Sequence, residues 1–306
     1  MAKRLRVTSP DGDQRMVSVQ DTTTVKKIMQ QSDEDGVVRD REATLIHGVT
    51  VLEPDMTVGE AGLEDGAEIS LVWSDPFVEM ASWTGDKTDQ PLYVRIPPGT
   101  TSIDEEAFCR CKDLVKVVIP DTVTSIEDRA FHGCSSLQHI NIPNSVTRIG
   151  PGAFSQSSLT EVEIPNSVTS IADGAFHVCR SLKQVGLSTS MKRIEFMTFA
   201  GCSSLTQVDV PDSVNIIGPS AFSGCSSLTQ VKIPNSVTCI LGMAFHGCSA
   251  LTRVEIPNSM TTIGDRAFHG CSSLAEVEIP ESVTTMGNDV FEGCSPSLVA
   301  GRKPEV

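Results

Sequence analysis

The chain has 306 residues, of which 39% are hydrophobic and 21% are charged. This balance is typical of globular proteins and excludes a chain that is disordered throughout. The 24 Lys and Arg residues are outnumbered by 39 Asp and Glu residues, which gives a formal net charge of -15. A phosphate backbone is repelled by such a charge, so we expect no nucleic-acid partner.

The sequence contains no run of about 20 apolar residues that could span a membrane. Its basic opening segment, MAKRLRV, is not followed by the apolar run of a secretory signal. The recurring PNSV segments place Val where a glycosylation acceptor needs Ser or Thr. We therefore expect no membrane association and a cytoplasmic location, with the nucleus as the alternative.

Residues 1–73 contain no internal repeat and form the first expected domain. The segments LRVTSPDG and QRMVSVQ predict two strands around an Asp-Gly turn, because Asp-Gly favours tight hairpins. The segment TTTVKKIMQQS predicts a Thr-capped amphipathic helix. The run ATLIHGVTVLEPDMTVGEAGLEDGAEISLVW then predicts a strand, a turn, a short loop and a final strand.

This order of elements over residues 3–73 resembles ubiquitin, which implies a β-grasp fold. The resemblance places a partner-binding patch on Leu45, His47, Gly48, Ser70 and Val72. Alternation along the last strand also turns Ser70 and Val72 outward if their neighbours face the core. Because the chain continues after Val72, this domain cannot be a conjugated tag as it stands. The outward Leu and Val form either a binding patch or scattered surface apolars.

Residues 74–91 are polar but carry Phe77, Met80 and Trp83. A solenoid exposes an apolar end, which these three side chains are placed to cover near Tyr93 and Ile96. We interpret the segment as an N-terminal cap, with a flexible tether as the alternative.

From residue 92 to 299 the chain repeats itself. Nine phenylalanines follow one another at 23-residue intervals, except for one interval of 22, and a fixed short period of this kind indicates a solenoid. They are Phe108, Phe131, Phe154, Phe176, Phe199, Phe222, Phe245, Phe268 and Phe291.

Each unit contains a short alternating apolar run, such as Leu251, Val254 and Ile256 before Pro257. Alternation that ends at a Pro predicts one strand, because Pro cannot donate to a continuing ladder. The following VTxI segment supplies a second inward strip, represented by Val237 and Ile240. One unit cannot bury these side chains alone, so the units must stack.

The consensus AFxGCSSLxxVxIPxSVTxIG resembles the BspA-type leucine-rich repeat. The resemblance implies a parallel-stranded solenoid that binds macromolecules without catalysis. The expected fold class is therefore α+β, with a ubiquitin-like β-grasp domain (1–73), a linker or cap (74–91), a parallel β solenoid of about nine units (92–299) and a tail (300–306).

Eight cysteines lie three residues after a repeat phenylalanine, so we expect them to form an inward column of reduced thiols. Equivalent side chains on stacked units point the same way, which disfavours disulfides between them. Cys109 and Cys239 lie outside this column and are the expected sites of thiol reagents. The column comprises Cys111, Cys134, Cys179, Cys202, Cys225, Cys248, Cys271 and Cys294.

Four histidines directly follow a repeat phenylalanine, and only His246 and His269 belong to adjacent units. Two imidazoles are too few for a closed zinc site, so we expect a solvated edge and no metal. The sequence also lacks the P-loop, zinc-protease, redox CxxC and hydrolase motifs. We therefore expect no enzyme activity, no cofactor and no small-molecule substrate.

Positions that packing does not constrain are available for recognition, and the outward side of the repeat strands offers two columns of them. We take Glu163, Asp209, Lys232, Arg253, Glu255, Glu276 and Glu278 as the candidate partner-binding residues. Stacking gathers Glu255, Glu276 and Glu278 into an acidic spot, which is either a site for a basic partner or solubilising surface.

One unit departs strongly from the consensus between Gly186 and Met197. It replaces Ile-Pro with Leu187-Ser188 and places Phe196 and Met197 at a turn. We interpret this as drift in a tolerant array, although an apolar turn is also typical of a contact surface.

These features together predict a non-catalytic adaptor for protein partners. The solenoid would bind a client while the ubiquitin-like domain docks on a receptor. The first alternative is a structural scaffold or assembly subunit, and a distant third is an adhesion-type surface protein.

Overall fold

The computed structural model describes residues 3–8, 14–20, 42–47, 50–52, 68–74, 77–79 and 92–302. The chain divides into two compact units, Met1–Phe77 and Val78–Val306. The regular elements in the described residues are all strands. The helix expected over residues 22–32 lies outside the described residues, so the α+β class is confirmed only in its β part.

The first unit contains a five-stranded mixed sheet with the order β2-β1-β5-β3-β4. Its strands are β1 (Lys3–Thr8), β2 (Gln14–Val19), β3 (Glu42–His47), β4 (Thr50–Leu52) and β5 (Glu68–Ser74). The hairpin β1–β2 is antiparallel, as the Asp-Gly turn predicts, and β1 pairs in parallel with β5. The strand β5 also pairs with β3 in antiparallel fashion. This strand order agrees with the ubiquitin-like fold that the resemblance implies.

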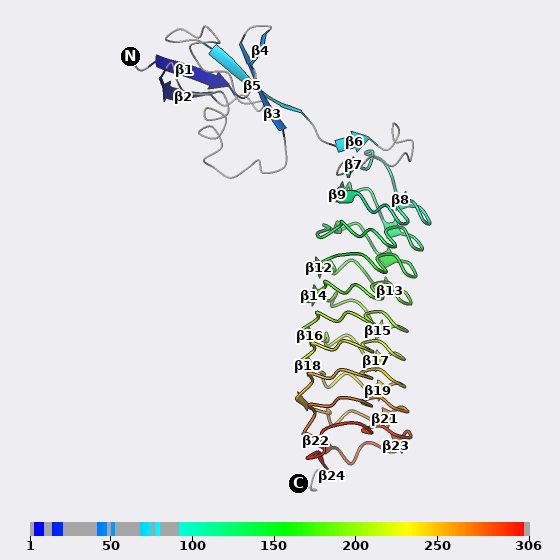
Figure 1. Ribbon diagram of the computed structural model, residues 1–306. Coiled ribbons are helices and arrows are strands. Elements are labelled where there is room, and N and C mark those ends of the chain that lie inside the picture. The colour runs from blue at the N-terminus through cyan, green and yellow to red at the C-terminus, as the bar shows by residue number, and fades with distance from the viewer. Residues whose placement is uncertain are drawn as a thin grey trace. The chain divides into compact units, whose positions relative to one another are not determined.

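The second unit is a parallel β solenoid with two strand columns (Figure 1). We call the outward side of the first column the strand face. Its strands are β6 (Phe77–Glu79), β7 (Leu92–Arg95), β9 (Leu114–Val118), β12 (Glu161–Glu163), β14 (Gln184–Gly186), β16 (Gln207–Asp209), β18 (Gln230–Lys232), β20 (Arg253–Val254), β22 (Glu276–Ile279) and β24 (Val299–Arg302).

The second column consists of two-residue strands, one in each coil of the stack. They are β8 (Ser102–Ile103), β10 (Ser125–Ile126), β11 (Arg148–Ile149), β13 (Ser170–Ile171), β15 (Arg193–Ile194), β17 (Ile216–Ile217), β19 (Cys239–Ile240), β21 (Thr262–Ile263) and β23 (Thr285–Met286). Equivalent residues pair one repeat apart, for example Ile217 with Ile240. This register is what a 23-residue period requires.

The two ends of the solenoid each add one strand to the strand-face column. At the N-terminal end, β6 lies beside β7 in one sheet, while the expected cap residues Met80 and Trp83 lie outside the described residues. At the C-terminal end, β24 pairs with β22. Residues 300–302, which we expected in the tail, therefore belong to a strand.

The core is a continuous stack of the nine repeat phenylalanine rings. Successive ring centroids lie 5.2 to 5.6 Å apart with interplanar angles of 3° to 10°. The eight rings from Phe108 to Phe268 are fully buried, and Phe291 at the end is partly buried. The nine rings are separated by eight ring-to-ring steps, and the chain makes one full turn of the solenoid in each step. The array therefore has about eight turns, where the sequence predicts about nine units. The inward position predicted for these residues is confirmed.

The cysteine column lies beside this stack. All ten cysteines are free, and six of the eight in the column are buried. Most of their thiols donate to the carbonyl of the phenylalanine in the preceding coil, as Cys225 Sγ does to Phe199 O at 3.2 Å. Where the short repeat lacks its cysteine, the buried Ser157 takes the position and its Oγ lies 3.3 Å from Cys179 Sγ.

A second ladder joins the turns that follow the short strands. We call the pairs 128–129, 151–152, 173–174, 196–197, 219–220, 242–243, 265–266 and 288–289 the turn edge. In the middle of this edge the N–H of Met197 donates to Pro219 O at 3.0 Å, and the N–H of Ser220 donates to Gly242 O at 3.0 Å. The same bond recurs between neighbouring pairs along the edge, so adjacent turns lie directly on one another.

The coil that departs from the consensus interrupts both strand columns. The paired strands end at β13 and resume at β15 on one side, and they end at β14 and resume at β16 on the other. Side chains replace part of the lost pairing, because Ser188 Oγ donates to Val168 O at 2.6 Å and Ser190 Oγ to Asn166 O at 2.6 Å. The phenylalanine stack continues through this coil unbroken.

Candidate functional site

The strand face presents a polar surface because side chains alternate along each short strand. In β12, β16 and β18 the central Val is buried while both neighbours are exposed. All seven candidate partner-binding residues of the solenoid are exposed on this face: Glu163, Asp209, Lys232, Arg253, Glu255, Glu276 and Glu278.

A groove of about 740 Å³ lies on the strand face where the strand column is interrupted. Gly186 is in its lining, between Glu163 of one neighbouring coil and Asp209 of the other. The Glu163 carboxylate lies over Gly186 and occupies the space that a side chain there would need. Asp212 and Lys232 contribute further charges, so the groove has several carboxylates around one ammonium group.

The expected acidic spot near the C-terminal end lines a second groove of about 600 Å³. Its charge is mixed, because Arg253 lies among the carboxylates. Arg253 Nη2 is 2.9 Å from Glu255 Oε1, and Arg253 pairs in register with Glu276. Both partners of this ion pair are exposed, so we assign it little stabilising free energy. Glu276 and Glu278 complete the lining.

The register of the first unit bears on the expected patch on the ubiquitin-like domain. Leu45 lies opposite Leu71, whereas Ile46 lies opposite Ser70 and Thr44 opposite Val72. Opposed residues of an antiparallel pair belong to the same face, so Ser70 and Val72 share their face with Ile46. Leu45 and His47 belong to the other face of β3, and Gly48 lies outside the described residues. The register thus separates Leu45 from Ser70 and Val72, and the patch as a whole stays a prediction.

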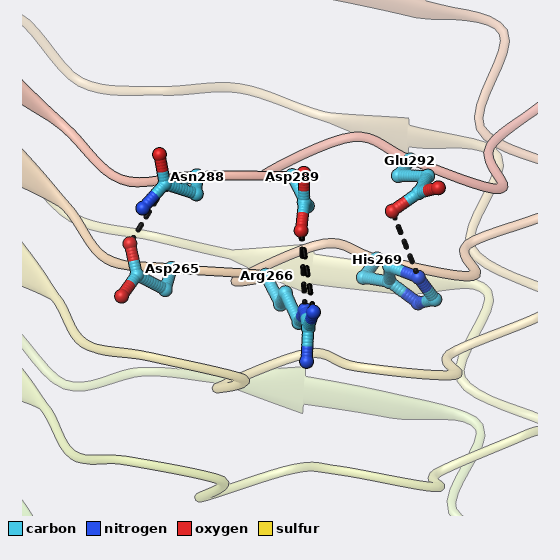
Figure 2. A network of polar contacts seen from close by, with 6 residues as sticks. All are labelled: Asp265, Arg266, His269, Asn288, Asp289 and Glu292. Carbon is cyan, nitrogen blue, oxygen red and sulfur yellow. Dashed lines mark hydrogen bonds and ion pairs between the residues drawn. The ribbon is translucent and has the colours of Figure 1, made fainter.

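The histidine column forms a polar edge with two stacked rings. The rings of His246 and His269 lie 5.0 Å apart, and His269 Nε2 is 3.5 Å from Glu292 Oε2 (Figure 2). Burial lowers the pKa of His132, and the nearby Arg129 and Arg110 add to this effect. Within the described part of the chain, no three His, Cys, Asp or Glu side chains are placed to hold a metal ion.

Two features of these surfaces escaped the sequence reasoning. The groove was missed, although Gly186 is the single glycine in a column of mostly polar and charged residues. The position of Ile46 opposite Ser70 was missed because a shift of one residue along β3 exchanges the two faces. The alternation of polar and apolar residues does not reveal that shift, since Leu45 and Ile46 are both apolar.

The geometry defines the class as a repeat protein with an exposed polar strand face. A family model described as "BspA type Leucine rich repeat region" matches residues 92–206 and 192–299. The chain therefore belongs to the BspA-type leucine-rich-repeat family. A second model, "Ubiquitin-2 like Rad60 SUMO-like", matches residues 4–72 and confirms the ubiquitin-like resemblance of that segment. A search of curated proteins found no match.

Among solved structures, a leucine-rich repeat protein from Bacteroides ovatus is 29% identical with a TM-score of 0.63. The match covers 69% of this chain and 60% of that protein, so the chain spans less than two thirds of its length. A T. pallidum leucine-rich repeat protein is 32% identical, with a TM-score of 0.46, and the match covers 60% of this chain and 78% of that protein.

This combination of units is suited to a protein-interaction or surface-adhesion role. Repeats of this class generally mediate protein interactions, and the fold is typically non-enzymatic. Among the described residues no helix is both long and apolar enough to cross a membrane.

Proposed function

We propose that the protein is a non-catalytic adaptor that holds a client protein on the strand face of its solenoid. The observation that supports this most is the 740 Å³ groove at Gly186, in the coil that interrupts both strand columns. A groove with charged walls can fix the position of a projecting side chain, which a flat ladder cannot do.

The charges of this groove favour a client segment that carries a basic residue. Glu163, Asp209 and Asp212 line it with a single lysine, Lys232. An Arg or Lys side chain that enters above Gly186 would lie between carboxylates from two coils. The chain's net charge of -15 would also speed the approach of a basic client.

In the same proposal, the ubiquitin-like unit docks on a receptor through the face that contains Ile46, Ser70 and Val72. Two apolar residues on adjacent strands of one face are suited to a small docking patch. Leu45 is replaced in this role by Ile46 because of the register. We place the adaptor in the cytoplasm or nucleus, with protein partners and neither membrane nor nucleic acid.

The test is affinity capture from source lysate with the intact chain and three variants. The double variant Glu163→Lys/Asp209→Lys reverses the charge at two positions of the groove. The double variant Ile46→Ala/Val72→Ala removes the two apolar side chains of the docking patch. The matched control is Asp121→Lys, which makes the same kind of charge reversal at an exposed turn residue. An adaptor loses one set of partners with the groove variant and a different set with the patch variant. The control retains both sets, and circular dichroism verifies the fold of every variant.

The alternatives predict other results. A scaffold subunit elutes in one large complex, and both variants lose the same partners together. An adhesion protein is recovered from the cell surface and binds there without help from the ubiquitin-like unit. Capture that is unchanged in both variants would contradict the adaptor proposal.

A further inference from the structure

The two grooves of the strand face are parts of one longer surface. Asp212 and Lys232 line both of them, so the grooves meet at these residues. The combined lining runs from His139 at one end to Glu278 at the other, across successive coils of the array. We call this combined lining the strand-face trough. An occupant of the whole trough must lie along the solenoid axis and across the strands.

One end of the trough is acidic and has an open position at its centre. Gly186 contributes no side chain there, and the Glu163 carboxylate of the paired strand lies over it. Asp209 follows on the next coil. Neither carboxylate forms an ion pair with any described residue of the solenoid. A cationic side chain that enters here can therefore bind both carboxylates.

The middle of the trough is basic. Lys232 lies beside Asp209 in register, yet no ion pair joins these two described residues, so the ammonium group is available to a ligand. Arg253 lies one coil farther, where its Nη2 is 2.9 Å from Glu255 Oε1. A guanidinium group has further N–H donors beyond this one contact. An anionic side chain of a client can thus bind between the two cations.

The far end of the trough is acidic again. Glu276 lies opposite Arg253 in register, and Glu278 is exposed on the same strand. Glu278 lies four repeats from Gly186, or about 19 Å at the usual spacing of paired strands. Lys232 and Arg253 lie two and three repeats from Gly186, or about 10 and about 14 Å. These distances determine the spacing of an extended chain that contacts all three regions.

We propose that the client segment is an extended peptide along the strand-face trough, with two basic residues six positions apart and an acidic residue between them. This inference rests on the proposed function and names the chemistry of its client. An extended chain rises about 3.4 Å per residue, and every second side chain faces the same way. A basic side chain above Gly186 is then followed by a second one near Glu278, about 20 Å along the chain.

The same spacing places the acidic residue of the client. Four positions after the first basic residue, about 14 Å along the chain, its carboxylate meets Lys232 and Arg253. If the chain runs in the opposite direction, the acidic residue comes two positions after the first basic residue instead. In both directions the three charged side chains lie on the face that contacts the solenoid.

The basic middle of the trough gives selectivity against segments that are basic throughout. A cation at the central position would approach Lys232 and Arg253, and like charges at short distance repel. The order of charges along the client therefore affects its affinity in addition to its net charge.

Fluorescence anisotropy of labelled peptides with the full chain tests the spacing. The probes are the nine-residue peptide SRTSTETRS and its reverse, SRTETSTRS, which represent the two chain directions. The control STRSERTTS has the same composition and net charge, but its arginines are three positions apart and point to opposite faces. We expect at least one patterned peptide to bind with a dissociation constant on the order of 100 µM, at least tenfold below that of the control. Equal affinity of all three peptides, or no binding up to about 1 mM peptide, would overturn the proposal.

Neutralising variants test whether the peptide lies in the trough. Asp209→Asn should weaken binding of the patterned peptide at least fivefold, whereas Asp173→Asn makes the same change at an exposed residue of the turn edge and should not. Lys232→Gln should remove the preference for the patterned peptide over a version with Gln in place of its Glu. Circular dichroism verifies the fold of each variant. Equal weakening by Asp209→Asn and Asp173→Asn would overturn the placement.

Client capture separates failure of this inference from failure of the proposed function. If Glu163→Lys/Asp209→Lys loses its client while patterned and control peptides bind alike, the groove holds a client of different spacing and only this inference fails. Client capture that survives this variant would instead overturn the proposed function.

Discussion

Each repeat residue of the core packs against the equivalent residues of the neighbouring coils. Phe222 has a ring above it and a ring below it, at 5.5 and 5.3 Å, and no exposed surface. Its removal therefore affects three coils, because both neighbouring rings lose a packing partner.

We expect Phe222→Ala to lower the free energy of unfolding by about 3 to 5 kcal/mol, through lost burial and the cavity left behind. Chemical denaturation of the dilute protein measures this loss. Phe196→Ala is the control, since Phe196 is exposed and its truncation should cost well under ~1 kcal/mol. Equal losses in the two variants would contradict the inward assignment.

The buried thiols make stability sensitive to alkaline pH. Burial raises the pKa of Cys179 to about 11 and that of Cys271 to about 12, from an ordinary value near 9. Above pH 9 the unfolded chain releases thiol protons that the folded chain keeps. The contribution of these thiols to the free energy of unfolding is therefore fully present below pH 9, and it is lost as the pH rises toward 11 to 12.

Each fully buried thiol should contribute a decrease of about 1.4 kcal/mol per pH unit in this range. Urea denaturation at pH 8, 9, 10 and 10.5 measures the slope. Cys225→Ser keeps a donor for Phe199 O but cannot ionise, so it should reduce the slope relative to the parent chain. A stability that stays constant up to pH 10.5 would exclude this mechanism.

Thiol reagents should distinguish the two groups of cysteines under native conditions. Cys109 and Cys239 are partly exposed, whereas the cysteines from Cys134 to Cys271 in the column are buried. Mass spectrometry after brief alkylation should find label first at Cys109, Cys239 and the partly buried end members Cys111 and Cys294. Early label at Cys225 would show that the coils open locally.

At the scale of one repeat element, backbone conformation matters as much as burial. The second residue after each repeat phenylalanine has a positive φ and is Gly in six coils, such as Gly201 (75°) and Gly224 (73°). In one coil the residue is Val178, at a φ of 59°. A β-branched residue in this region is strained because its Cβ crowds the backbone.

We expect Val178→Gly to raise the free energy of unfolding by about 1 kcal/mol, since relief of strain exceeds the added freedom of the unfolded chain. Thermal or urea denaturation measures the gain. The reverse change, Gly201→Val, should destabilise, because its Cβ would also lie 3.1 Å from Val178 Cγ2. A destabilised Val178→Gly would show that the Val side chain contributes more by packing than it costs in strain.

The sequence predicts the elements well where the period itself encodes them. The Phe, Leu, Val and Ile positions recur in phase, so their burial and the parallel register follow from the repeat alone. The departure at Leu187 and Ser188 marks the coil that interrupts both strand columns, but an apolar-polar pair there does not indicate that strand pairing is lost. On β3, two adjacent apolar residues left the faces of Leu45 and Ile46 undetermined.

On the scale of the whole solenoid, stability depends on neighbours along one axis. Each inner coil packs on two others, while the last coil packs on one. The difference is visible at the C-terminal end, where Met286 is 46% exposed and Phe291 is only partly buried. Polar contacts such as Arg266–Asp289 join this coil to the one before it, but they are exposed and weak.

Hydrogen exchange should therefore be slowest in the central coils and fastest in the last coil. We expect amides between Phe199 and Phe245 to have protection factors at least tenfold above those after Thr285. Mass spectrometry of peptic fragments measures both sets in one experiment. Uniform protection along the array would indicate a single cooperative unit and contradict this gradient.

The 22-residue interval between Phe154 and Phe176 shows how such an array can change over evolutionary time. One residue is missing between Phe154 and Leu159, yet the two rings stack at 5.2 Å like their neighbours. The short loop absorbs the deletion, and Ser157 links to the next coil in place of a cysteine. The loss of one codon from this loop is therefore silent for the core, and the coils on both sides keep their register.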